Sequence, residues 1–373
     1  MGKTMRAIGL MSGTSMDGID VAMIDTDGES RLERGPALTI AYDEEFRASL
    51  QRAISEAQHL ADRTGRPGCL AEVERELTRQ NAAAVERFLA EGRLTPGAVD
   101  VVGFHGHTVL HAPDRRLTVQ LGDGPGLAAA IGIDVVYDLR AADCAAGGQG
   151  APLAPVYHRA LAASLPQRPI AVLNIGGVAN VTWIGRSGEL ISFDTGPGNA
   201  LIDDWMQRRL GFPRDEHGSL AAKGRVHDDY VTQYLRHSYF GAPPPKSLDR
   251  NAFPLGLVHS LSHEDGAATL TAFTAASIAR AREHFPEQPQ LWVVSGGGRL
   301  NKTLMSMLAG HVEGAVAPAE AAGMDGDAVE AEAWAYLAVR SLKGLPVSFP
   351  GTTGVPMPLT GGVLAKKGRL AKT

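Results

Sequence analysis

One turn near the start of the chain restricts the fold most strongly. Residues 9–20 read Gly-Leu-Met-Ser-Gly-Thr-Ser-Met-Asp-Gly-Ile-Asp and are flanked on both sides by short apolar runs. Those runs are too short for helices and are bounded by glycine, so they predict two strands joined by a turn. Gly13 and Gly18 allow backbone angles and close approaches that a Cβ prevents, and Thr14 and Ser15 add hydroxyl groups. Successive N–H groups in such a turn can bind an anion, although an ordinary hairpin is the commoner use of a glycine turn.

The same pattern returns in the second half of the chain. An apolar run at 170–175 leads into a glycine turn at 176–180, and a second apolar run follows at 181–184. Residue identity between the two copies is low, so only the pattern repeats. A chain of 373 residues is long enough for two domains. We therefore predict two α/β domains, residues 1–166 and 167–373, around a cleft that binds the ligand.

Apolar spacing and good helix-forming residues predict the main helices. These lie near residues 44–62, 68–91, 199–210, 268–284 and 327–342.

Four glycine-rich turns follow predicted strands, at 12–18, 176–177, 194–198 and 295–298. One such turn is weak evidence, but four of them indicate a nucleotide phosphate chain in the cleft. Neither the P-loop motif nor a complete Gly-x-Gly-x-x-Gly motif is present, so a P-loop site and a dinucleotide site are both disfavoured. The Gly-x-Ser-x-Gly motif is also missing, which disfavours a serine hydrolase.

Asp194 is the candidate catalytic carboxylate. It ends the apolar run 190–193 and precedes the sequence Thr-Gly-Pro-Gly-Asn. A carboxylate at that place can accept a proton from a nucleophile or hold a metal ion through water. The alternative is a purely structural role, as a helix N-cap or in an Asx turn.

Histidine and charged residues supply further candidates. His105, His107 and His111 form a cluster, but without a third ligand at metal-binding spacing we favour substrate hydrogen bonding or packing over a metal site. Arg140 is suited to bidentate recognition of a carboxylate, or it forms a surface ion pair. Glu330 lies in the first turn of a predicted helix, where an acid also complements the helix dipole.

Composition limits the partners of the chain. It has 36 Lys and Arg residues against 41 Asp and Glu residues, a net charge of −5, and this balance gives no reason to expect nucleic acid. No apolar run approaches the roughly 20 residues of a membrane helix, so no membrane partner is expected. The two cysteines, Cys69 and Cys144, form no metal or disulfide pattern. Cytoplasmic location is the expectation.

Several sequence blocks in one order resemble the anhydro-N-acetylmuramic acid kinase family. The resemblance covers essentially the whole chain. It implies membership of the acetate kinase, sugar kinase, Hsp70 and actin superfamily, whose two RNase H-like domains enclose an interdomain cleft. The blocks are Gly9–Asp20, Phe104–Thr108, Gln120–Gly124, Gly147–Pro152, Asn174–Gly177, Phe193–Asn199 and Ser295–Gly298.

The resemblance implies an ATP-dependent kinase of peptidoglycan recycling. Such an enzyme uses ATP and water to open the 1,6-anhydro bridge of 1,6-anhydro-N-acetylmuramic acid and to phosphorylate O6, which gives N-acetylmuramic acid 6-phosphate and ADP. Asp194 matches the catalytic base that deprotonates the water. The family also implies a homodimer.

The remaining site residues fall into two groups. Nucleotide contacts are expected from the first turn and from two later glycine pairs, namely Gly13, Thr14, Ser15, Met16, Asp17, Gly18, Ile19, Asp20, Gly176, Gly177, Gly296 and Gly297. Sugar contacts are expected from Ser12, His105, Thr108, Arg140 and Glu330, with Arg140 on the lactyl carboxylate.

One residue departs from the wider superfamily. Many members carry an Asp four residues before the Thr of the first phosphate turn, and this chain has Leu10 there. The Mg²⁺ that accompanies ATP is then held mainly by phosphates, water and other acids, with Asp194 as one candidate.

Three rival functions stay open at this point. They are another kinase of the superfamily acting on a different sugar or carboxylate, a non-kinase ATPase module resembling Hsp70, and a glycosidase with paired carboxylates.

Overall fold

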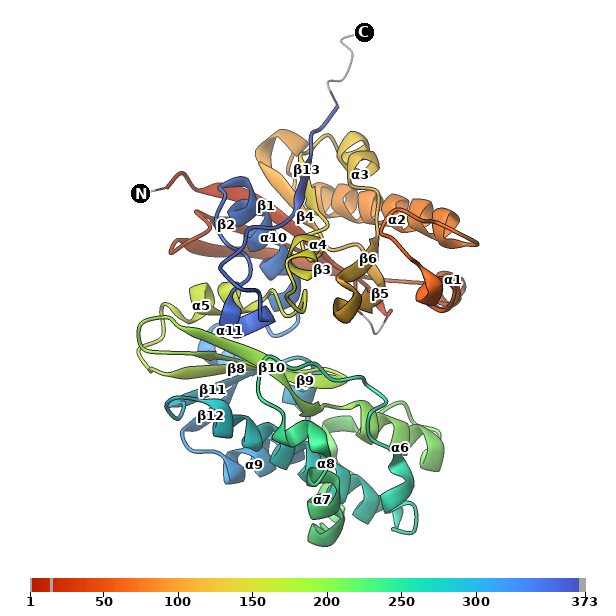
Figure 1. Ribbon diagram of the computed structural model, residues 1–373, viewed down its shortest axis with the longest axis vertical. Helices are drawn as coiled ribbons and strands as arrows, with labels where there is room; N and C mark the ends of the chain where they lie inside the picture. Colours follow the sequence, from red (N-terminus) through yellow and green to blue (C-terminus); the bar gives the residue numbers. More distant parts are fainter. Residues whose placement is uncertain (1, 14–15, 369–373) are drawn as a thin grey trace. The chain divides into compact units, whose positions relative to one another are not determined.

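The computed structural model describes residues 2–13 and 16–368. Two of the predicted nucleotide-binding residues, Thr14 and Ser15, lie outside the described residues. The chain forms two compact units (Figure 1), the first made of residues 1–163 and 328–373 and the second of Ser164–Asp327. No described helix combines the length and the apolar character that a bilayer-spanning segment requires.

Each unit contains one main sheet. The first sheet has the order β13-β7-β4-β1-β2-β3, and a separate hairpin pairs β5 with β6. The second sheet has the order β10-β9-β8-β11-β12. The bounds in the first unit are β1 (Met5–Met11), β2 (Gly18–Thr26), β3 (Leu32–Ala41), β4 (Val101–Phe104), β5 (His107–Ala112), β6 (Leu117–Leu121), β7 (Val135–Tyr137) and β13 (Val363–Ala365). In the second unit they are β8 (Ile170–Ile175), β9 (Val178–Ile184), β10 (Leu190–Pro197), β11 (Leu291–Ser295) and β12 (Ala315–Pro318).

The two sheets share one topology. In each sheet the first three strands in chain order are antiparallel neighbours. The first strand also pairs in parallel with the fourth, and the fourth pairs in parallel with the fifth. These strands are β1, β2, β3, β4 and β7 in the first unit and β8, β9, β10, β11 and β12 in the second. The predicted duplication of an RNase H-like α/β arrangement is therefore confirmed.

The helices lie close to their predicted positions. The first unit contains α1 (Glu44–Glu56), α2 (Leu70–Glu91), α3 (Gly124–Ile131), α4 (Ala141–Ala145), α5 (Pro155–Ala162), α10 (Val329–Leu342) and α11 (Pro350–Thr353). The second contains α6 (Ala200–Leu210), α7 (Asp228–Leu235), α8 (His263–Ala279) and α9 (Lys302–His311). Asp43 caps α1, since its side chain accepts a hydrogen bond from the backbone of Phe46.

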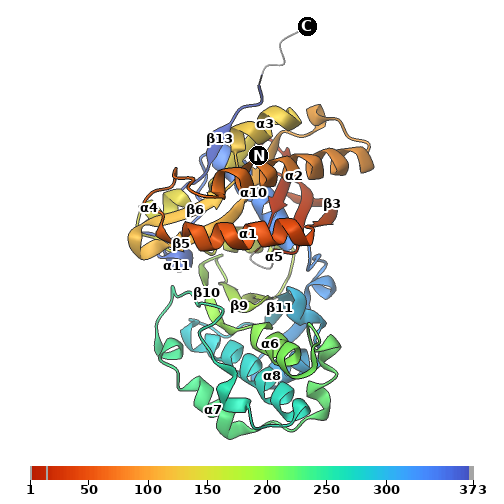
Figure 2. The same cartoon turned by 90° about the vertical axis from the view of Figure 1, so that its right-hand side faces the viewer.

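Successive side chains of β1 point to opposite faces of the first sheet, and helices cover both faces. Ile8 and Leu10 are buried in the core that α1, α2 and α3 complete, and Figure 2 shows α1 and α2 lying alongside each other. Gly9 points to the opposite face, where α10 packs against β1, β2 and β4. Gly9 is the direct partner of Gly103 on β4, so two neighbouring positions on that face lack side chains.

The glycine pair explains how closely α10 approaches the sheet. A Cβ at Gly9 would overlap the backbone carbonyl of Ala331, and a Cβ at Gly103 would overlap that of Trp334. Both obstructing atoms belong to the α10 backbone, which cannot move aside as a flexible side chain can. Helix α10 therefore belongs to the first sheet.

This packing corrects the predicted domain limits. The structure changes unit at 163/164, three residues from the predicted boundary at 166/167. The second domain does not extend to residue 373 as predicted, because residues 328–373 return to the first unit. A helical pattern in the sequence predicts a helix but does not determine which sheet the apolar face of that helix packs against.

Helix α8 forms the centre of the second unit. It packs against α6, α7, α9 and β10 (Figure 2), and its residues are small or apolar on nearly every side. A helix of that kind is stable only when other elements surround it. Gly266 admits the indole ring of Trp205 from α6, since a Cβ there would overlap the ring.

The close packing of α10 yields a stability prediction. We expect Gly103→Ala to lower the free energy of unfolding by about 1–3 kcal/mol, because the new methyl group meets rigid backbone. Gly310→Ala is the matched control, since a Cβ at Gly310 in α9 has no neighbour within 4 Å and alanine favours helix. Urea denaturation measures both variants. Equal effects of the two substitutions would contradict the packing argument.

Candidate active site

The first glycine turn joins β1 to β2, as predicted. The backbone N–H of Met16 donates to the carbonyl of Gly13 at 3.1 Å, and Met16 has a positive φ of 53°. Gly18 is required by packing, because a Cβ there would overlap the carbonyl of Ile40 on β3. Gly18, at the end of the turn, therefore packs directly against the neighbouring strand β3.

The predicted nucleotide residues after Gly18 differ in what they can offer a ligand. Ile19 is buried in the core of the first unit, so only its backbone can reach a ligand. The carboxylate of Asp20 accepts a hydrogen bond from Thr39 Oγ1 at 2.6 Å, while Asp17 is exposed.

Ser12 belongs to a buried hydrogen-bonded chain. Tyr42 donates its hydroxyl to Ser12 Oγ at 3.0 Å, and Ser12 Oγ lies 3.1 Å from His107 Nδ1. Burial raises the pKa of Tyr42 and lowers the pKa of His107 to about 4, so both are neutral at pH 7. The hydrogen bond between Ser12 Oγ and His107 Nδ1 therefore joins two neutral groups. Within the described residues His107 Nε2 has no hydrogen-bond partner.

His105 fixes the position of Arg140. His105 Nδ1 lies 3.0 Å from the Ser12 carbonyl, and a carbonyl only accepts, so Nδ1 carries the proton and Nε2 is an acceptor. The guanidinium Nη2 of Arg140 is 3.4 Å from that Nε2, and Nη1 donates to the Gly150 carbonyl at 3.0 Å. Burial and the Arg140 charge keep the pKa of His105 well below its usual value.

Trp334 and Glu330 complete the surroundings of Arg140. The Arg140 guanidinium carbon lies 5.1 Å from the centre of the Trp334 ring, a cation–π distance. Burial lowers the pKa of Arg140, and the negative charge of Glu330 opposes that shift. Both Trp334 and Glu330 come from α10, about 190 residues from Arg140 in the sequence. The structure therefore brings three predicted sugar residues, His105, Arg140 and Glu330, into one charged group.

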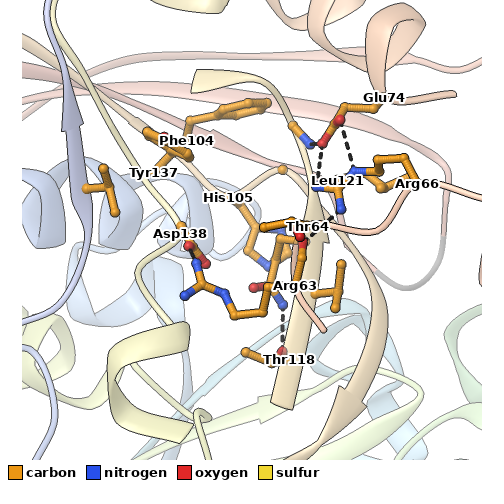
Figure 3. A pocket seen from close by; sticks show the side chains of 15 residues that line it. Arg63, Thr64, Arg66, Glu74, Phe104, His105, Thr118, Leu121, Tyr137 and Asp138 are labelled. Atoms are coloured by element: carbon orange, nitrogen blue, oxygen red, sulfur yellow. Dashed lines mark hydrogen bonds and ion pairs between the residues drawn. The ribbon is translucent and has the colours of Figure 1, made fainter. Parts of the chain in front are cut away.

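A pocket of about 450 Å³ opens at the carboxyl ends of β4 and β7. Figure 3 shows Arg63 reaching toward Asp138 and Arg66 toward Glu74, and both are ion pairs. His105 lines this pocket, but the other predicted sugar residues do not. The pocket therefore lies beside the group around Arg140.

The fifth predicted sugar residue, Thr108, lies on β5 of the β5–β6 hairpin. Its Oγ1 accepts a hydrogen bond from Gln120 Nε2 at 3.2 Å, and that amide also donates to Thr118 Oγ1 at 2.8 Å.

In the second unit three glycine turns come together. Asn199 donates its backbone N–H to the carbonyl of Gly176 at 2.7 Å, and Gly198 donates to that of Gly177 at 2.9 Å. A Cβ at Gly198 would overlap the Gly176 carbonyl, so the two turns meet backbone to backbone. A Cβ at Gly297 would lie 3.7 Å from the Asn199 side chain. These three turns therefore lie next to one another within this unit.

Asp194 lies at an irregularity of β10. The register with β9 shifts between Asp194 and Gly196, so Thr195 is an extra residue, as in a β-bulge. A bulge changes the direction in which the strand presents its side chains. Asp194 therefore leaves the regular alternation of the strand.

The carboxylate of Asp194 is partly buried and accepts a single hydrogen bond within the described residues. Its Oδ2 accepts from the backbone N–H of Leu248 at 2.8 Å, and Oδ1 has no hydrogen-bond partner within the described residues. Burial raises the pKa of Asp194 to about 7, and the Leu248 hydrogen bond lowers it only partly. A carboxylate whose pKa is raised toward neutrality is a better base than an exposed aspartate.

A segment that the sequence reasoning missed holds Asp194 in place. Tyr239 donates its hydroxyl to the Asp194 carbonyl at 2.5 Å, the Asp194 N–H donates to the Lys246 carbonyl at 3.0 Å, and Leu248 binds the carboxylate. Lys246 Nζ in turn lies 4.8 Å from the centre of the Tyr239 ring. These residues follow Asp194 by about 45 to 54 positions, and no motif in the sequence marks them.

The residues available to a metal ion are few. No group of three or more His, Cys, Asp or Glu side chains suited to a metal ion occurs in the described part of the chain.

Two α/β units that share one sheet topology, each with a glycine turn after its first strand, define the class of this protein as a duplicated RNase H-like fold. The sequence model described as anhydro-N-acetylmuramic acid kinase matches residues 5–367. The chain belongs to the anhydro-N-acetylmuramic acid kinase family.

Relatives of that name are similar along their full length. The protein from Methylobacterium nodulans is 55% identical over 373 residues, which cover 97% of this chain and 100% of the relative. The protein from Azorhizobium caulinodans is 56% identical over 367 residues, which cover 96% and 99%. Component A of the (R)-2-hydroxyglutaryl-CoA dehydratase of Acidaminococcus fermentans has a TM-score of 0.48 at 14% identity, with 91% of this chain and 99% of that one covered. The last similarity is too low to add to the argument.

The raised pKa of Asp194 yields a prediction about stability. A carboxyl group with a raised folded-state pKa holds its proton more tightly in the folded state, so its ionisation destabilises that state as the pH rises toward 7. We expect Asp194→Asn to raise the free energy of unfolding at pH 8 by on the order of 1–4 kcal/mol. The gain should shrink toward pH 5.

Denaturant unfolding of the variant and the wild type at both pH values measures this difference. Asp229→Asn, at an exposed site in α7, should show no such pH dependence. A pH-independent effect of Asp194→Asn would contradict the burial argument.

Proposed function

We propose that this chain is the kinase that opens the 1,6-anhydro bridge of 1,6-anhydro-N-acetylmuramic acid with water and transfers the γ-phosphoryl group of ATP to O6. The products are N-acetylmuramic acid 6-phosphate and ADP, as peptidoglycan recycling requires. Membership of the family supports the reaction. The single observation that carries the mechanism is the partly buried Asp194 carboxylate, whose pKa desolvation raises to about 7.

Asp194 acts as the general base in this proposal. Its free Oδ1 accepts a proton from water, and the water oxygen forms a bond to the anomeric carbon. The bond between that carbon and O6 then breaks, and O6 keeps the electron pair. O6 attacks the γ-phosphorus, and ADP leaves, so one water molecule is consumed and one proton is released in total. The Leu248 N–H holds the other carboxylate oxygen and so orients the base.

The glycine turns bind the phosphate chain. Phosphoryl transfer depends mainly on positioning and on stabilising the charge that develops on the phosphoryl oxygens. Backbone N–H groups can approach phosphate closely where no Cβ intervenes, as at Gly176–Gly177 and Gly296–Gly297. Mg²⁺ bound to the phosphates would neutralise further charge, and Asp194 is a candidate for an indirect contact through water.

Arg140 recognises the lactyl carboxylate of the sugar. Two of its nitrogens are oriented by His105 and Gly150, which presets the guanidinium and reduces the entropy lost on binding. Glu330 compensates the positive charge when no ligand is present. Arg140→Lys keeps a charge but loses the planar fork of donors, so it is not a conservative change at this site.

We further propose a cytoplasmic homodimer, which the family resemblance favours and which light scattering in solution can test. The net charge of −5 gives no attraction to nucleic acid.

The base assignment predicts the effect of Asp194→Asn on turnover. The amide cannot accept the proton from water, so we expect kcat for phosphorylation of the anhydro sugar to fall by about 10²–10⁴-fold. The Leu248 N–H can still donate to the amide oxygen, so ATP affinity should stay within about twofold of the wild type. Asp229→Asn serves as the control and should turn over normally. Activity close to wild type in Asp194→Asn would overturn the assignment.

Product analysis tests the function itself. Mass spectrometry should detect a product heavier than the anhydro sugar by one water and one phosphoryl group, and only when ATP is present. Bridge opening without ATP would instead favour a glycosidase, and phosphorylation of ordinary hexoses in preference would favour another sugar kinase.

A further inference from the structure

Arg250 lies beside the Gly176–Gly177 turn and is not part of the chemistry described above. A Cβ at Gly177 would lie 3.8 Å from Arg250 Nε and 3.9 Å from its Cδ. The side chain of Arg250 therefore passes directly over the turn. Its guanidinium therefore places a positive charge beside the turn, although Arg250 is not part of any glycine motif.

The present partner of Arg250 is easily replaced. Arg250 Nη2 donates to Asp204 Oδ1 at 3.0 Å, and the two side chains are 56% and 35% exposed. An ion pair with that much exposure contributes little in water. Among the described residues no other acceptor binds the guanidinium, so most of its five N–H donors remain available for a ligand.

The chain that leads to Arg250 also holds the catalytic base. Lys246 and Leu248 hydrogen-bond the backbone and the carboxylate of Asp194, and Arg250 follows two residues later. The segment 246–250 thus connects the base to the glycine turn. The same backbone segment therefore positions both the Arg250 guanidinium and the Asp194 carboxylate.

We propose that Arg250 binds the phosphate chain of ATP at the Gly176–Gly177 turn, and that its guanidinium moves from Asp204 to phosphoryl oxygens when the nucleotide binds. The proposal rests on the ATP-dependent function proposed above. Arginine is suited to this contact because its planar donors match phosphate oxygens in pairs. Lys246 is less suited, since its ammonium group donates to the Tyr239 carbonyl and lies near His284.

Nucleotide binding to Arg250→Gln tests the proposal. We expect the Kd for ATP with Mg²⁺, measured by titration calorimetry, to rise about tenfold or more, as for the loss of a hydrogen bond to a charged group. The Kd for adenosine, which has no phosphate, should change by less than about twofold. Arg186→Gln is the matched control, because Arg186 is also an exposed arginine of this unit paired with an acid, Glu287. It should leave both constants unchanged.

Asp204→Asn provides a second variant with the opposite sign. It removes the competing acid, so ATP should bind a few times more tightly, and the gain should disappear in the double variant with Arg250→Gln. ATP affinity of Arg250→Gln within twofold of wild type would overturn the proposal. Equal weakening of ATP and adenosine would also overturn it, since that result indicates a structural role.

Failure of the proposed function gives a different result. In that case the wild type binds ATP but forms no phosphorylated product from the anhydro sugar. The comparison of ATP with adenosine does not use the sugar, so it tests Arg250 independently.

Discussion

The parallel pairing of the first and fourth strands is the constraint on which the rest of each unit depends. It joins β1 to β4 in the first unit and β8 to β11 in the second. Parallel neighbours end at the same edge of a sheet, so residues distant in sequence emerge together there. In the first unit this pairing brings His105 to the Ser12 carbonyl. In the second it sets Ser295 beside Asn174, next to the glycine turns.

Much of this arrangement could be predicted from the sequence because the signals are local. Each strand–turn–strand unit spans only about 20 residues of sequence, and the period of apolar residues identifies the long helices. The sequence marks the glycine turns at 176–177, 194–198 and 295–298 as candidate phosphate sites, and within the second unit these turns lie next to one another. Position in the sequence singles out Asp194 and Arg140 as candidates, the family resemblance implies their roles, and the structure shows their surroundings.

The rest depends on contacts between distant parts of the chain. The return of α10 to the first sheet depends on Gly9 and Gly103, whose role is to admit a helix backbone. Asp194, the proposed base, is held by Tyr239 and Leu248, which no spacing rule connects to it. Ser12 was predicted as a sugar contact, yet its hydroxyl is engaged in a buried chain with two aromatic partners. Sequence patterns identify residues with chemistry, but packing decides which of their atoms are free.

The central claim is that Asp194 activates water for attack on the anomeric carbon, and that O6 is freed by that attack. Reaction of 1,6-anhydro-N-acetylmuramic acid with ATP in ¹⁸O-water, followed by fragmentation mass spectrometry, tests this most directly. We predict one ¹⁸O atom on the anomeric carbon and an unlabelled phosphate ester at O6. Phosphorylated product without ¹⁸O at the anomeric carbon, under conditions that exclude later exchange, would contradict the account.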